Sequence, residues 1–151
     1  MSKSCFFIGH ASTPDEIYPN ILNAIRQHIV DCGVTHFYVG HYGRFDSMVT
    51  SALREAKADY SEITIMRVLP YHPGIKPVDV PKGFDGTHYP FEDRVPPRYA
   101  IVKANNLMIE TVDYLIAYVN GVGKSRDFLE YALRREKSGL ITVTNLGSYH
   151  E

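Results

Sequence analysis

Residues 120–125, Asn-Gly-Val-Gly-Lys-Ser, place two glycines, a cation and a hydroxyl directly before a helical pattern of apolar residues. At a helix N-terminus, free backbone N–H groups and the positive end of the helix dipole favour an anion. Glycine lets the backbone approach a phosphate closely, and Lys124 adds a positive charge. The segment departs from a Walker A motif, because Tyr118 stands where that motif has its first glycine. It predicts either a phosphate-binding loop or a plain turn with a solvated lysine.

Two earlier loops, residues 9–12 and 40–43, also contain glycine and each follows a short apolar run. His10 and His41 could donate hydrogen bonds to a phosphate or a ribose hydroxyl, or be polar turn residues. Asp46 could bind a ribose hydroxyl, or be one of the acidic residues that are common in a first helical turn.

Carboxylates that could assist cleavage of a glycosidic bond are Asp127 and Glu130 in the last predicted helix, and Glu110 in the helix before it. The alternative is that all three are solvated helix residues. The histidines have no third ligand at matching spacing, so we predict no metal site, and no cofactor is expected.

Short apolar runs predict the strands, and apolar residues at helical spacing predict the helices between them. Isoleucines at every fourth position from Ile17 to Ile29 indicate the first helix. Thr13 is a candidate cap for this helix, and Pro19 should bend it or shift its start. The predicted strands are residues 5–8, 35–39, 63–69, 113–119 and 140–146, and the later helices include residues 45–56, 99–111 and 128–133.

Residues 70–97 hold seven of the nine prolines and show neither a helical nor a strand period. A loop this long within one domain is usually functional or disordered, and it would suit a lid or wall over a cleft. Tyr71, which follows the third predicted strand, could stack on a base or be a half-buried wall residue.

The alternation of strands and helices predicts an α/β fold. We expect a single domain over residues 1–151 with a Rossmann-like, doubly wound, five-stranded parallel sheet in the order 3-2-1-4-5 and helices on both faces. In such a sheet the strand order reverses between the first and fourth strands, and ligands bind at the carboxyl ends of the strands there. The three glycine loops all lead toward that edge.

The composition of the chain argues against some classes of partner and location. Lys and Arg total 16 against 17 Asp and Glu, with no basic stripe, so nucleic acid is an unexpected partner. The N-terminal apolar run is too short for a signal peptide, and no stretch approaches the ~20 residues of a membrane helix. We therefore expect a cytoplasmic protein without a membrane partner. Cys5 and Cys32 show no C-x-x-C spacing and should be reduced, packed thiols.

The order of these segments resembles the SLOG superfamily, which includes the DprA proteins and the Lonely Guy phosphoribohydrolases, and is most similar to its small YpsA-like branch. The resemblance is carried by residues 6–10, 37–40, 43–46, 68–71, 97–105, 113–118 and 124–132. It implies a nucleotide-binding domain and a homodimer that forms through helices beside the cleft.

In the Lonely Guy branch, an arginine-lysine pair on one helix precedes a P-G-G-x-G-T-x-x-E loop, and the arginine and glutamate are implicated in removing the base. Residues 119–127 match the loop, with Asp127 in place of the glutamate, while Ala104 and Asn105 stand where the arginine and lysine would be. Alanine cannot replace the bidentate donor, so the resemblance favours binding over hydrolysis. Arg98 and Lys103 remain as nearby cations for a phosphate.

Three functions follow. The first is a sensor or sequestering protein for a phosphorylated nucleoside, such as an ADP-ribose-type nucleotide, and the second is an N-glycosidase that acts on nucleoside monophosphates, with Asp127 or Glu130 as the catalytic carboxylate. The third is a regulatory scaffold for protein interactions. The predicted ligand-binding residues are Gly9, His10, Ser12, Gly40, His41, Gly43, Asp46, Tyr71, Arg98, Lys103, Asn120, Gly121, Gly123, Lys124 and Ser125.

Overall fold

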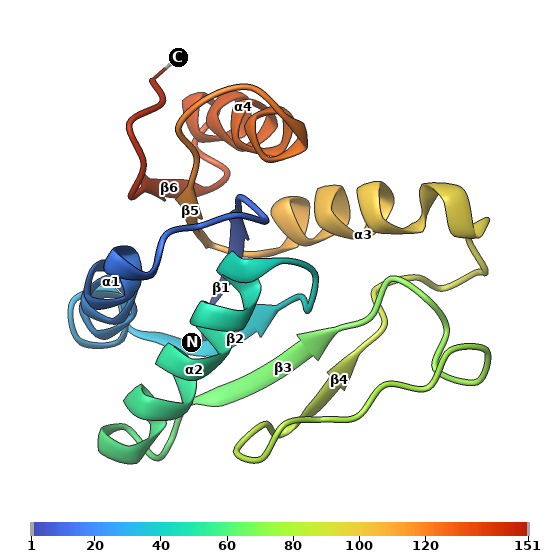
Figure 1. Ribbon diagram of the computed structural model, residues 1–151, viewed down its shortest axis with the longest axis horizontal. Coiled ribbons are helices and arrows are strands. Elements are labelled where there is room, and N and C mark those ends of the chain that lie inside the picture. The colour runs from blue at the N-terminus through green and yellow to red at the C-terminus, as the bar shows by residue number, and fades with distance from the viewer. Residues whose placement is uncertain (1, 151) are drawn as a thin grey trace.

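The computed structural model describes residues 2–150, in which six parallel strands form one sheet in the order β4-β3-β2-β1-β5-β6 (Figure 1). The strands are β1 (Lys3–Gly9), β2 (Val34–Val39), β3 (Thr64–Val68), β4 (Gly86–His88), β5 (Tyr114–Tyr118) and β6 (Thr142–Asn145). The α/β class and the parallel sheet are confirmed. The predicted count of five strands is wrong, and so is the order 3-2-1-4-5, because β4 extends the sheet beyond β3.

β4 arises inside the segment that was predicted to lack strands. It has only three residues, which is too short to show an alternating pattern. Backbone hydrogen bonds hold β4 beside β3. The N–H of Leu69 donates to the carbonyl of His88 at 2.8 Å, and the N–H of Asp85 donates to the carbonyl of Ile65 at 2.8 Å. The Asp85 carboxylate accepts the N–H of Ile65 and the ammonium of Lys57, and these hydrogen bonds lower the pKa of Asp85.

Helices cover both faces of the sheet. Those in the described chain are α1 (Tyr18–Val30), α2 (Arg44–Asp59), α3 (Pro97–Thr111) and α4 (Lys124–Lys137), and a 3-10 turn, Asp15–Ile17, precedes α1. Residues of α1 and α2 pack into one hydrophobic cluster and residues of α3 and α4 into another, on opposite sides of the central strands (Figure 1). The crossovers therefore bring the helices that follow β2 and β5 to opposite faces.

The start of α1 differs from the predicted cap. The Thr13 hydroxyl donates to the carbonyl of His10 at 2.6 Å, and no side chain caps the 3-10 turn or α1. Pro19 lies in the first turn of α1, where its missing N–H costs no helical hydrogen bond. Of the two expectations for Pro19, a bend or a shifted start, the structure shows the shifted start. The Thr13 hydroxyl stabilises the loop before the helix and does not cap it.

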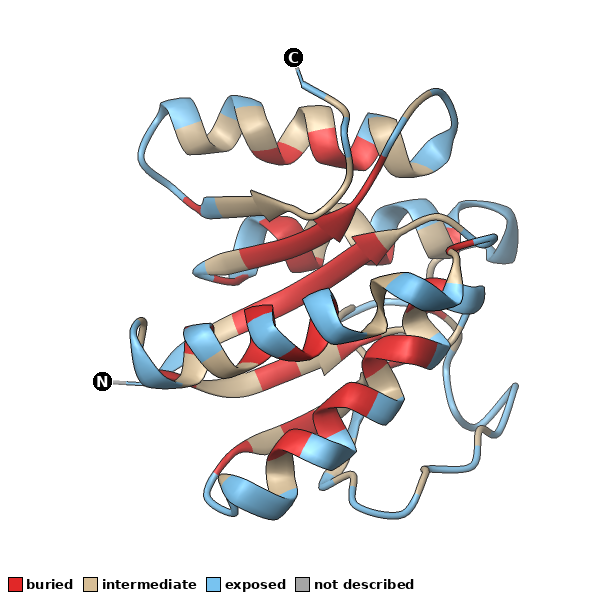
Figure 2. Ribbon diagram, turned by 60° about the vertical axis from the view of Figure 1, so that its left-hand side comes forward, coloured by how far each residue is buried: buried red, intermediate tan, exposed pale blue. Residues whose placement is uncertain are grey.

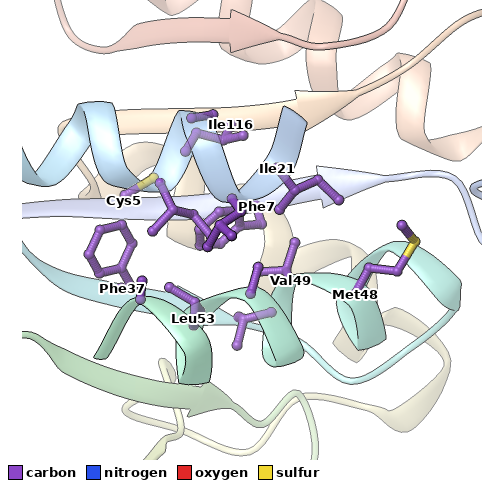
Figure 3. Close-up of a cluster of buried hydrophobic side chains, with 14 of the residues drawn as sticks. Cys5, Phe7, Ile21, Phe37, Met48, Val49, Leu53 and Ile116 are labelled. Carbon is purple, nitrogen blue, oxygen red and sulfur yellow. The ribbon is translucent and has the colours of Figure 1, made fainter. Parts of the chain in front are cut away.

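β1 is buried on both faces, as its continuous apolar run predicts. Phe7 belongs to the cluster under α1 and α2, and Phe6 to the cluster under α3 and α4; each is 1% exposed. Figure 3 shows Phe7 at the centre of the first cluster, with Ile21 of α1 and Leu53 of α2 around it. Burying each phenylalanine contributes about 1.5–3 kcal/mol. In Figure 2 the buried residues gather in the central strands and on the helix faces turned toward them.

The register of the central strands aligns the loops that follow them. Gly9 at the end of β1 lies opposite Tyr118 at the end of β5, and Phe6 lies opposite Tyr38 near the end of β2. The loops after β1, β2 and β5 consequently leave the sheet at one edge. Between residues 2 and 150 we find no helix with the length and apolar character needed to cross a membrane.

Candidate functional site

A cavity of about 230 Å³ lies at the carboxyl ends of β1, β2 and β3, enclosed by the starts of α2 and α4 and by α3. We call it the inner cavity. Its polar lining comes from Gly9, Gly40, Asp46, Asn105, Lys124 and Ser125, and its apolar lining includes Phe6, Ile8, Val68, Pro70, Ile101 and Phe128. Five predicted ligand-binding residues therefore meet in one place: Gly9, Gly40, Asp46, Lys124 and Ser125.

The glycines after β1 and β2 are required by close packing of the protein itself. A Cβ atom at Gly9 would overlap the ring of Phe45, and one at Gly40 would lie 2.8 Å from a carboxylate oxygen of Asp46. Gly43 has φ of +97°, a conformation that L residues rarely adopt, and directly after it Arg44 donates its N–H to the carbonyl of Ala11 at 2.9 Å. These glycines bring the two loops together beside the cavity.

The start of α4 forms the second wall. Gly123 has φ of +133° and no side chain caps the helix, so the first-turn N–H groups are not taken by a capping side chain. Lys124 and Ser125, the first two residues of α4, both line the inner cavity. The Ser125 hydroxyl donates to the carbonyl of Gly9 at 2.9 Å, which ties α4 to the end of β1. The cation and the helix dipole therefore act at the same wall.

Several predicted polar residues connect the loops to each other. His10 Nε2 accepts the N–H of Asn120 at 2.9 Å, so the neutral ring carries its hydrogen on Nδ1. The Asn120 amide donates to the hydroxyl of Tyr118 at 2.8 Å, and its carbonyl oxygen accepts the N–H of Ser148 at 2.8 Å. His10 and Asn120 do not line the inner cavity, and these hydrogen bonds give them a structural role.

Asn145 at the end of β6 is a positioning residue that the sequence analysis missed. Its side-chain oxygen accepts the N–H groups of Val119 and Gly147, and its amide donates to the carbonyls of Val119 and Tyr149. It thus fixes the backbone directly before the 120–125 loop. An asparagine near the chain end has no sequence pattern that would assign it this role.

Asp46 supplies a carboxyl group to the lining of the inner cavity. Burial raises the pKa of its carboxyl from 3.8 to about 7, and the hydrogen bond from the N–H of Tyr42, at 3.2 Å, and the charge of Arg67 offset part of the rise. Asp46 keeps some accessible surface because it faces the cavity, while protein atoms surround the carboxyl on its other sides. Near neutral pH this carboxyl can either donate or accept a proton.

Arg67 interacts with Asp46 and His41 interacts with Arg67, and neither of the two lines the inner cavity. The Arg67 guanidinium donates to the hydroxyl of Thr50 at 3.3 Å and lies 5.1 Å from the ring centre of Phe84, and burial lowers its pKa. Burial also lowers the pKa of His41, and the positive charges of Arg67 and Lys76 add to this effect. The predicted contact of His41 with a ligand is therefore not supported by its position.

The two predicted catalytic carboxylates are not brought to the inner cavity. Asp127 lines a neighbouring groove of about 360 Å³ between α3 and α4, which shares Lys124 and Phe128 with the inner cavity. Glu130 accepts the hydroxyl of Tyr149 at 2.9 Å and pairs with Arg126 at 3.7 Å. Asp127 thus shares the groove with Lys124, whereas Glu130 is engaged by Tyr149 and Arg126.

The remaining predicted residues lie around the inner cavity without lining it. Arg98 and Lys103 are on α3 with their cationic groups over the ring of Tyr99, at 4.8 and 5.9 Å from its centre. Tyr71 belongs to a separate cavity in the 70–97 segment. Ser12, Gly43, Gly121 and Gly123 are in the surrounding loops. The lining also includes residues that the sequence did not predict to bind a ligand, among them Tyr42, Asn105, Pro70, Ile101 and Phe128.

Among residues 2–150, no group of three or more His, Cys, Asp or Glu side chains could hold a metal ion. Cys5 and Cys32 are both free thiols, and burial raises the pKa of Cys5 well above its usual value. A search of protein-family models finds none that matches the chain, and a search of curated proteins finds no match either. The fold and the cavity define an α/β protein with a largely apolar cavity, which a few polar groups line, at the carboxyl edge of a parallel sheet. The resemblance to the SLOG superfamily stays a hypothesis.

Proposed function

We propose that this protein is a Rossmann-like, doubly wound nucleotide-binding protein of the SLOG type, which senses or sequesters a phosphorylated nucleoside. An ADP-ribose-type nucleotide is the ligand class that the resemblance favours, and a homodimer is the assembly that it favours. The observation that carries the proposal is the wall formed by the start of α4, where Lys124 and an uncapped helix N-terminus meet the inner cavity.

The place of the cavity in the sheet supports the same function. β1 pairs with β2 on one side and with β5 on the other, so the chain order reverses at β1. Ligands of doubly wound sheets bind at the carboxyl ends of the strands beside such a reversal. The inner cavity lies at this reversal. Its volume of about 230 Å³ would hold the phosphate and part of the sugar of a nucleotide.

The second candidate is an N-glycosidase, and Asp46 is the observation that favours it. A general acid works best with a pKa near the working pH, and the pKa of this cavity carboxyl is about 7. In that reaction water attacks the sugar carbon, the bond to the base nitrogen breaks, and a protonated carboxyl donates its proton to the departing base. The proton that the attacking water loses then restores the carboxyl. Asp127, in the groove that shares Lys124, is the other carboxylate within the same region.

The test is calorimetric titration of nucleoside monophosphates, diphosphates and ADP-ribose into the protein and its Lys124→Ala variant, with mass spectrometry of the recovered ligand. Lys124→Ala should weaken binding by about 1–3 kcal/mol, the usual worth of a charge-assisted hydrogen bond. Lys103→Ala is the matched control, because the Lys103 ammonium lies over Tyr99 outside the inner cavity. Free base among the products would identify the hydrolase, and failure of every nucleotide to bind would favour the scaffold.

A further inference from the structure

A second cavity, of about 330 Å³, lies between the 70–97 segment and the start of α3. We call it the outer pocket; its lining includes Tyr71, His72, Tyr89, Arg94 and Pro97. We propose that the outer pocket binds the base of the same nucleotide whose phosphate the inner cavity holds, an inference that rests on the proposed function. The site would take a planar heteroaromatic ring, such as a purine or pyrimidine.

The side chains of the outer pocket suit such a ring. Tyr89 makes edge-to-face contacts with His72, at a ring-centre distance of 5.3 Å and an angle of 76°, and with Phe91, at 5.3 Å and 79°. Arg94 adds a guanidinium that can stack on a heterocycle or donate to its ring nitrogens and carbonyl oxygens. Aromatic rings beside an arginine are a common platform for a base.

The rim of the outer pocket is held in place by hydrogen bonds. His72 Nδ1 accepts the N–H of Gly74 at 3.0 Å, and the carbonyl of His72 accepts the N–H groups of Ile75 and Lys76 at 2.9 and 3.0 Å. The neutral His72 ring therefore carries its hydrogen on Nε2. The Lys76 ammonium lies 4.8 Å from the ring centre of Tyr71 and joins this turn to the next lining residue. A pocket ordered before binding loses little conformational entropy when the ligand enters.

The linings of the outer pocket and the inner cavity adjoin each other at two places, although no residue lines both. At the first place Pro70 lines the inner cavity and the next residue, Tyr71, lines the outer pocket. At the second place Ile101 and Pro97, about one turn apart on α3, line the inner cavity and the outer pocket respectively. A ligand that occupies both sites would pass between these two places.

Most other aromatic rings near the phosphate site are buried or covered. In the inner cavity Phe6 is 1% exposed and Phe128 is 8% exposed, whereas Tyr42 is 40% exposed and packs against His41 with the ring centres 4.2 Å apart. In the groove between α3 and α4, Tyr131 donates its hydroxyl to Glu110, and two arginine side chains lie over its ring. Tyr42 is therefore the ring that competes with the outer pocket for the base, and the variants below distinguish the two.

The ligands that separate the two sites are ribose 5-phosphate, which lacks a base, and the nucleoside 5′-monophosphate of adenosine, guanosine, cytidine or uridine that binds most tightly. On the unmodified protein the monophosphate should bind at least tenfold more tightly than ribose 5-phosphate. Equal affinities would overturn the outer-pocket inference and leave the proposed function intact. If neither ligand binds while ADP-ribose does, this inference fails alone; if no nucleotide binds, the proposed function fails with it.

Variants then locate the base. Tyr89→Leu and Arg94→Ala should each lower the affinity for the monophosphate about five- to hundredfold, the range expected for loss of one stacking contact. The affinity for ribose 5-phosphate should change by less than about twofold. Arg94 makes no ring contact with Tyr89, so its variant tests the pocket even if Tyr89→Leu lowers the melting temperature. Tyr99→Leu is the matched control, an exposed tyrosine of α3 that lines neither site. A loss of affinity with Tyr42→Leu but with neither outer-pocket variant would place the base over Tyr42 and overturn the inference.

Discussion

Replacing Asp46 by asparagine should stabilise the protein at pH 8 and change its stability little near pH 4. The pKa of the carboxyl is about 7 in the folded protein and 3.8 in an unfolded chain. The folded state therefore holds the proton more tightly, so stability falls as the pH rises from about 4 to about 7 and stays low above that. The asparagine amide is neutral throughout and its oxygen can still accept the N–H of Tyr42.

The size of the effect follows from that pKa difference. Ionising Asp46 in the folded protein costs on the order of 4 kcal/mol more than ionising it in the unfolded chain. Rearrangement around the charge reduces this figure, so we expect Asp46→Asn to gain about 2–4 kcal/mol at pH 8. The gain should shrink to about 1 kcal/mol at pH 4.5, where the carboxyl is protonated in the folded state.

Urea unfolding of both proteins at pH 4.5, 6 and 8 measures the difference. Asp85→Asn is the matched control, because its hydrogen bonds with Lys57 and Ile65 lower the pKa of Asp85. Asp85 contributes stability that is present above its ordinary pKa and is lost as the pH falls through the lowered value, so Asp85→Asn should destabilise the protein most at neutral and higher pH. A gain for Asp46→Asn that is the same at pH 4.5 and pH 8 would refute the burial of this carboxyl.

Two further predictions concern the loops around the inner cavity. Gly9→Ala should destabilise the protein by about 1–3 kcal/mol in urea unfolding, because the added Cβ overlaps Phe45. Gly121→Ala is the control and should have little effect, because no atom lies within 4 Å of its added Cβ. Equal losses of stability in the two variants would contradict this account. Asn145→Ala should cost about 1–3 kcal/mol because it leaves the N–H of Val119 without its acceptor, and it should speed hydrogen exchange at Val119. Unchanged exchange there would show that Asn145 does not hold the loop.

Most of the fold could be predicted because its elements carry strong local patterns. β1 and β5 are continuous apolar runs, and α1 has isoleucines at helical spacing. β4 could not be predicted, since three residues at an edge have no pattern and their pairing depends on bonds to β3. The Thr13 cap failed for a similar reason: the hydroxyl has a better-placed acceptor in the preceding loop.

The candidate site was predictable where it depends on topology. The glycine loops and Lys124 converge because parallel strands end at one edge. The roles of individual polar side chains were harder to predict, because their partners are distant in sequence. The bond between His10 and Asn120 joins residues 110 positions apart, so a histidine that resembled a ligand donor holds a loop instead. The pKa of Asp46 likewise depends on burial that only the packed structure provides.

The two edges of the sheet are also its shortest strands. β4 has three residues and β6 has four, while the interior strands have five to seven. An exposed edge presents unpaired N–H and C=O groups that can recruit a strand from another molecule, and short edge strands limit that risk of aggregation. The 70–97 segment thus has a protective effect beyond the outer pocket: without β4, the five residues of β3 would form the exposed edge.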